Sequence, residues 1–160
     1  MNVLIAILLS ICLGRPLNGA VIAPFAPVGQ FGGHWGIDLE ATPGTVVKAP
    51  AHGTVTFAGT VAGMRTVTID VGTGTLVSVS YLEEVSVSSG MLVRLGEELG
   101  RSGRAHGRPA LHLSVRQAGR YVDPMPYLGC RPMGELYLLP PPEASTYAGQ
   151  SAQRLARRDI

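Results

Sequence analysis

Apolar and polar residues alternate along much of the middle of the chain, with the period of two that is typical of half-buried β-strands. Residues 66–71 read T-V-T-I-D-V, so every second residue is valine or isoleucine. A second alternating run covers residues 76–81, and the G-T-G at 72–74 between them has the length and composition of a hairpin loop. The two runs therefore predict an antiparallel hairpin.

Shorter runs of the same kind continue the pattern on both sides of this hairpin. They predict further strands at residues 46–49, 54–58, 91–94, 111–116 and 121–123, with turns at 50–53 and 117–120. No amphipathic helical stretch interrupts this region. The expected fold class is all-β, an antiparallel sandwich or open barrel.

The first 20 residues have a different pattern. The run from Val3 to Leu13 has the length of a signal-peptide core and is too short to span a bilayer comfortably. Gly19 and Ala20 are small enough to mark a cleavage site, so residues 1–20 are interpreted as a signal peptide. The alternative is a buried N-terminal strand or helix.

Composition divides the remainder into an extended Pro/Gly-rich segment at 21–29, a β domain at 30–139 and a flexible tail at 140–160. Removal of the leader would take Cys12 with it and leave Cys130 as the one thiol, without an intrachain disulfide. At 160 residues the chain is long enough for one domain, expected to act as a monomer. A net charge of +2 without a basic stripe argues against nucleic acid as a partner.

Candidate chemistry begins at residues 33–38, which read G-H-W-G-I-D. His34 and Asp38 offer the imidazole nitrogen and carboxylate oxygen that zinc accepts. On a straight strand they would lie roughly 13 Å apart, too far to share an ion. Gly36 between them permits a bend that would bring them together. Alone, such a pair is more often a turn held by a hydrogen bond.

His112 strengthens the metal hypothesis. It lies between Leu111 and Leu113 in an apolar strand, where an unpaired imidazole would be costly to bury. Two histidines and one aspartate, with a fourth position for water, is the composition of a catalytic zinc site. His52 precedes a glycine in a predicted surface turn and is not expected to be a ligand.

These segments resemble the lysostaphin/LytM-type zinc metallopeptidases over roughly residues 30–128. Residues 34–38 match the family's H-x-G-x-D motif, 93–100 its V-x-x-G-x-x-I-G turn, 111–116 its H-L-H strand and 122–124 its closing V-D-P. The resemblance implies that His34, Asp38 and His112 hold zinc. It also implies that the substrate is a peptide bond of bacterial cell-wall peptidoglycan.

Two departures from the family pattern concern catalysis. The first histidine of the family's H-L-H assists the attacking water or the developing oxyanion, and here that position is Ala110. A second family histidine follows the tyrosine of a Y-x-H strand end, where this chain has Tyr81 and then Glu83. Each such loss costs on the order of 10²–10⁴-fold in rate. Glu83, as general base, and the loop histidine His106 are the candidate replacements.

The pattern also resembles a divergent branch among secreted proteins of actinobacteria, in which the strand ends Y-E-P and the residue two before the last ligand is not histidine. Two functions follow from the resemblance: a secreted or cell-envelope zinc peptidase with impaired catalysis, or a non-catalytic, zinc-retaining module. Such a module would bind peptidoglycan or regulate another cell-wall hydrolase or a membrane complex. A biotinyl-type carrier with Lys48 as its modified residue is a third, weaker alternative, because Lys48 falls inside a predicted strand. Trp35 and Tyr81 are expected either to line a substrate groove or to pack in the domain.

Overall fold

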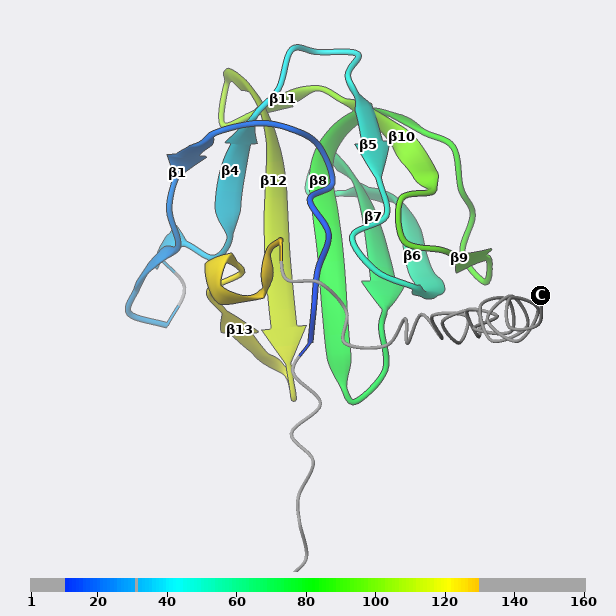
Figure 1. The fold of residues 1–160 in the computed structure, drawn as a ribbon. Helices are drawn as coiled ribbons and strands as arrows, with labels where there is room; N and C mark the ends of the chain where they lie inside the picture. Colours follow the sequence, from blue (N-terminus) through cyan, green and yellow to red (C-terminus); the bar gives the residue numbers. More distant parts are fainter. Residues whose placement is uncertain (1–10, 31, 130–160) are drawn as a thin grey trace, which may run out of the picture.

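Short β-strands make up nearly all of the regular structure in the computed structural model, which describes residues 11–30 and 32–129. The strands are β1 (Val21–Ala23), β2 (Ala26–Val28), β3 (Gly32–His34), β4 (Ile37–Glu40), β5 (Val46–Lys48), β6 (Gly53–Val61), β7 (Met64–Asp70), β8 (Thr75–Val85), β9 (Leu92–Val93), β10 (Glu98–Ser102), β11 (Arg104–Ala105), β12 (Arg108–Gln117) and β13 (Arg120–Val122). One 3-10 turn, η1 (Met125–Tyr127), follows them (Figure 1). The prediction of an all-β, antiparallel fold is confirmed.

The main sheet has the strand order β1-β4-β12-β8-β7-β6-β9, and its strand pairs are antiparallel. The predicted hairpin is formed by β7 and β8. Strand β8 also pairs at its far end with β10, and β10 in turn pairs with β5. Strand β8 therefore joins the main sheet to a small ribbon formed by β10 and β5.

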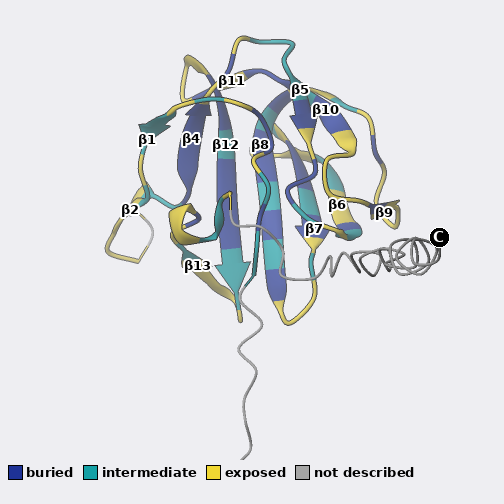
Figure 2. Cartoon of the chain, in the orientation of Figure 1, coloured by how far each residue is buried: buried dark blue, intermediate teal, exposed yellow. Residues whose placement is uncertain are grey.

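One face of the main sheet is apolar and the other is polar, as the alternation in the sequence predicts. Val77 and Val79 of β8 are almost fully buried and belong to the hydrophobic core, together with Val67 and Ile69 of β7. The residues between them carry hydroxyl groups and face a groove. Figure 2 shows how buried residues concentrate in the central strands β4, β12 and β8.

The segment that precedes β1 is part of the core. Leu13 is 0% exposed and Leu17 is 6% exposed, and both belong to the main hydrophobic cluster. Backbone hydrogen bonds attach the segment to the domain: the amide of Lys48 donates to Pro16 at 2.8 Å, and the amide of Leu13 donates to Tyr127 at 2.8 Å. Residues 11–20 thus contribute apolar contacts and backbone partners to the domain.

This packing differs from what the signal-peptide interpretation leads one to expect. Cleavage near Ala20 would remove two core leucines, and Cys12, expected to leave with the leader, is disulfide-bonded. The chain's other cysteine, Cys130, and the predicted tail at 140–160 lie outside the described residues. The leader itself stays a prediction.

Within the described ranges, we find no helix with the length and apolar character needed to cross a membrane.

Candidate metal centre

His34 and Asp38 are brought together by a bend in the chain. Strand β3 ends at His34, the backbone bends at residues 35–36, and β4 begins at Ile37. A Cβ atom on Gly36 would lie 2.6 Å from His112 Nε2, so only glycine fits at this bend. His34 Nε2 consequently lies 3.1 Å from Asp38 Oδ1, as the sequence predicts for a bent segment.

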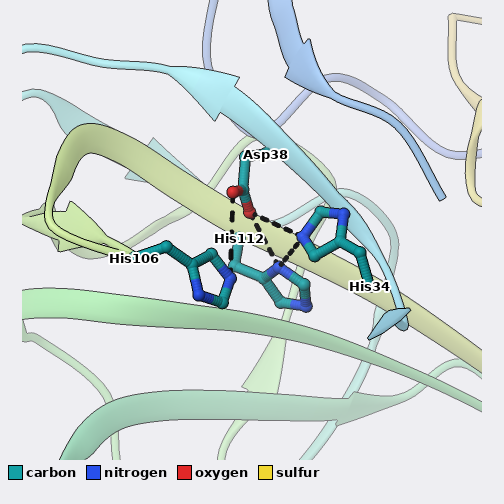
Figure 3. A group of neighbouring side chains, drawn as sticks. All are labelled: His34, Asp38, His106 and His112. Carbon is teal, nitrogen blue, oxygen red and sulfur yellow. Dashed lines mark hydrogen bonds and ion pairs between the residues drawn. The ribbon is translucent and has the colours of Figure 1, made fainter. Parts of the chain in front are cut away.

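His112 completes the group from the neighbouring strand. Strands β4 and β12 are paired with Asp38 directly opposite His112. The Nδ1 atom of His112 lies 2.8 Å from Asp38 Oδ1 and 3.1 Å from His34 Nε2. Figure 3 shows the three side chains converging, His34 from β3, Asp38 from β4 and His112 from β12. Three potential ligand atoms thus lie within 3.1 Å of one another.

This donor set suits zinc. Ligands about 2.1 Å from a tetrahedral zinc ion lie about 3.4 Å apart, so the three atoms need to move by only a few tenths of an ångström. The other ring nitrogen of His34, Nδ1, lies 2.7 Å from the carbonyl oxygen of Pro24. A hydrogen bond donated to that carbonyl fixes the tautomer that leaves Nε2 free to bind a metal. Pro24 acts through its backbone, which sequence reasoning had no signal to detect.

The side chain of His106 joins His34, Asp38 and His112 from a tight hairpin. It lies with Gly107 between β11 and β12, where Ala105 pairs with Arg108. Positive φ values of 51° and 77° at the two residues define a two-residue turn of type I′. His106 Nε2 lies 3.8 Å from Asp38 Oδ2, and the four ligand atoms of the group all lie within 4.8 Å of one another (Figure 3). Its side chain is 49% exposed, against 15% for His112.

The imidazoles determine the charge state of Asp38. Burial of the carboxyl raises its pKa, but the hydrogen bond with His112 and the nearby imidazoles of His34 and His106 lower the pKa further than burial raises it. The net effect holds the pKa of Asp38 below its usual value, so the carboxylate is ionised and ready for a cation. Burial, with a smaller effect of the Asp38 charge, raises the pKa of Tyr81, which keeps the phenol protonated.

The other residues singled out in the sequence lie elsewhere. Glu83 is exposed, and its carboxylate points towards Gly44 and not towards the histidines. Ala110 is fully buried beside Glu40 of β4. His52 is exposed in a bend before β6, as predicted. Of the two candidate catalytic residues, the structure brings His106 to the candidate metal group (His34, Asp38, His106 and His112) and leaves Glu83 outside it.

A groove of about 500 Å³ runs from the metal group over the polar face of the main sheet. Its floor carries hydroxyl groups in hydrogen-bonded pairs: Thr66 donates to Ser80 at 3.0 Å, and the hydroxyls of Thr68 and Ser78 lie 2.8 Å apart. Aromatic side chains from four different segments line it, namely Trp35, Phe57, Tyr81 and Tyr121. Trp35 and Tyr81 both line this groove and are partly buried, so the structure fits both expectations for them.

Comparisons with known proteins agree with this fold. The sequence profile of "Peptidase family M23" matches residues 32–124. The chain is 32% identical over 118 residues to the "Murein hydrolase activator EnvC" of Escherichia coli, covering 71% of this chain and 28% of that protein. A solved structure of a putative M23 peptidase from Pseudomonas aeruginosa is 32% identical, with a TM-score of 0.61, and the match covers 73% of this chain and 50% of that one.

The antimicrobial peptidase lysostaphin from Staphylococcus simulans shares the fold at 23% identity and a TM-score of 0.61, over 79% of this chain and 57% of that chain. The chain spans less than a third of the length of EnvC. The profile match covers more than half of the chain. The chain belongs to peptidase family M23.

Proposed function

We propose that this chain is a zinc hydrolase that cuts peptide bonds of peptidoglycan in the cell envelope, with His106 in place of the missing family histidines. The observation that carries the proposal is the position of His106, whose Nε2 lies 3.8 Å from the carboxylate of Asp38. His34, Asp38 and His112 are the proposed zinc ligands, since their ligand atoms lie 2.8–3.1 Å apart.

A zinc ion in this group would act as a Lewis acid and lower the pKa of a coordinated water to roughly 7. The protein itself would contribute a proton carrier, His106, and a groove that binds the substrate. His106 takes a proton as the oxygen of water bonds to the carbonyl carbon of the substrate. It returns a proton to the amine as the C–N bond breaks. An exposed imidazole at the edge of the group can exchange protons with both substrate atoms.

The groove supports a peptide substrate. Its hydroxyl floor offers donors and acceptors to an extended main chain, and aromatic walls bury apolar area at low cost in side-chain entropy. Trp35 and Tyr121 form one wall, with ring centroids 5.9 Å apart. Arg116, whose guanidinium carbon lies 5.9 Å from the Tyr121 ring centroid, adds a positive charge that would attract a peptide carboxylate.

A second candidate is a non-catalytic module that keeps zinc and regulates another cell-wall hydrolase. All four ligand atoms lie within 4.8 Å of one another, and four protein ligands are typical of closed structural zinc sites. In that arrangement His106 is the fourth ligand and no position stays open for water. The buried Ala110, where active relatives of the resembled type have histidine, favours this candidate too, as does the name of EnvC.

Metal analysis and a peptidoglycan-release assay on the same samples separate the two candidates. With His106 as the proton carrier, His106→Ala keeps near-stoichiometric zinc and loses about 10²–10⁴-fold in release rate. With His106 as a fourth ligand, His106→Ala weakens zinc affinity, and the unaltered protein releases nothing. His112→Ala should lose zinc in either case, and exposed His52→Ala is the matched control that should change neither zinc nor release.

Glu83→Gln tests the alternative base suggested by sequence position. Because the Glu83 carboxylate lies near Gly44, away from the histidines, we expect release to continue at the unaltered rate. Loss of release in Glu83→Gln with zinc intact would return the role of base to Glu83. Absence of zinc from the unaltered protein after equilibration with the metal would refute the ligand assignment and both candidates with it.

A further inference from the structure

Tyr81 is unusual in its backbone conformation. Five non-glycine residues in the described ranges have positive φ, and four of them, including His106, lie in turns between strands. Tyr81, with φ of 65°, is the one that lies inside a strand. A bulky residue in the left-handed region is strained, and such residues persist where the surrounding structure holds them.

The strain accompanies a β-bulge. On the pairing of β7 with β8, Thr66 lies opposite Ser80 and Arg65 lies opposite Leu82, which leaves Tyr81 as the extra residue. At the same point β8 stops pairing with β12, whose His112 lies opposite Ser80, and begins to pair with β10. Strand β8 therefore changes partners at Tyr81.

The bulge reverses which way the following side chains point. Along β8 the odd-numbered Val77 and Val79 face the core, so unbroken alternation would turn Tyr81 inward too. Instead Tyr81 faces the groove, and Leu82, which is 5% exposed, enters the core. Without the extra residue, the phenol would have no access to the groove.

In the groove, the phenol meets the hairpin that carries His106. The Tyr81 hydroxyl lies 3.3 Å from His106 Nδ1, and the two ring centroids are 5.0 Å apart. The backbone joins them as well, since the amide of Gly103, just before β11, donates to the Tyr81 carbonyl at 2.9 Å. The contact uses Nδ1 of His106 and leaves Nε2 facing Asp38 at 3.8 Å.

We propose that Tyr81 is a positioning residue: the bulge in β8 turns its phenol onto His106, and the hydroxyl–Nδ1 contact holds the imidazole so that Nε2 faces the metal group. The proposal rests on a site role for His106, as in the proposed function, and holds whether His106 carries protons or binds zinc. It makes a residue of β8, outside the proposed zinc ligands, responsible for the geometry of the most exposed histidine in the group.

Tyr81→Phe tests this, because it keeps the ring and the bulge and removes only the hydroxyl. The first readout is the pair of imidazole ¹⁵N chemical shifts of His106 in the full chain, assigned by their loss in His106→Ala. We expect the His106 shifts to change in Tyr81→Phe. If His106 is not a zinc ligand, the zinc content of this variant should stay unchanged. Tyr121→Phe, which removes a hydroxyl from the other groove tyrosine, should leave them in place.

The second readout is peptidoglycan release, which should fall about 10–100-fold in Tyr81→Phe, as when a group that orients a site histidine is removed. Tyr81→Asn adds a folding control, since asparagine tolerates the left-handed conformation and lacks the phenol. It should displace the His106 shifts while thermal unfolding stays cooperative. Identical His106 shifts in unaltered protein, Tyr81→Phe and Tyr81→Asn would overturn the positioning role. Displaced shifts in a protein without any release would uphold that role and refute only the proposed hydrolysis.

Discussion

The packing of residues 11–20 into the core can be tested with a single side chain. Leu13 is fully buried, and Leu→Ala at such a site costs about 2–5 kcal/mol through lost transfer free energy and the cavity left behind. Domains of this size are stable by only about 5–15 kcal/mol, so the loss is a large fraction of the total. At roughly 4 °C per kcal/mol, the Tm of Leu13→Ala should fall by about 8–20 °C.

The matched control is Leu92→Ala, because Leu92 is 77% exposed and its truncation should change the free energy of unfolding by no more than about 0.5 kcal/mol. Urea unfolding of both full-length variants, followed by tryptophan fluorescence, gives the comparison. Intact-mass measurement on exported protein identifies the first residue of the mature chain. Equal midpoints for Leu13→Ala and the unaltered protein would refute the packing argument. A mature chain that begins near residue 21 would show that export removes this segment, whereas the full-length variants compared in urea retain it.

Three further predictions concern other parts of the fold. Gly36→Ala should lose zinc in equilibrium dialysis, because the added Cβ would lie 2.6 Å from His112 Nε2; retention of stoichiometric zinc would contradict the geometry of the bend. Cys12→Ser should lower the free energy of unfolding by about 2–4 kcal/mol, and reductant should lower the urea midpoint of the unaltered protein but not of the variant. Ala118→Gly should raise stability by about 1 kcal/mol, because alanine at φ of 46° is strained, whereas Ala58→Gly within β6 should lower it; a lower Tm for Ala118→Gly would argue against strain in that turn.

Local patterns were enough to predict the main hairpin and the bent metal segment. The alternation at 66–71 and 76–81 arises from neighbouring residues, and the structure confirms it as β7 and β8. Gly36 between His34 and Asp38 permitted a bend that would bring the two side chains together, and the structure contains that bend. The structure gathers these two with His112, while their role as ligands stays a prediction.

Features that depend on contacts between distant parts of the chain could not be predicted from local sequence patterns. An apolar run such as that around Leu13 has the same hydropathy whether it is a leader or a core segment, and only its contacts distinguish the two. The bulge at Tyr81 follows from β8 pairing with different strands at its two ends, a property of the sheet and not of residues 80–82. The position of His106 depends on the β11–β12 hairpin. The sequence indicated that His106 lies in a loop but not which way its side chain points.

The chain enters and leaves the described domain side by side. Leu13 and Leu128 form a parallel bridge, in which the amide of Gly129 donates to Leu13 and the amide of Leu13 donates to Tyr127, both at 2.8 Å. Tension applied between the segment before Leu13 and the segment after Gly129 would pull this parallel pair in shear, loading both hydrogen bonds together instead of one after the other. Such a load would act on this junction before it reached β4 and β12, the strands that carry Asp38 and His112.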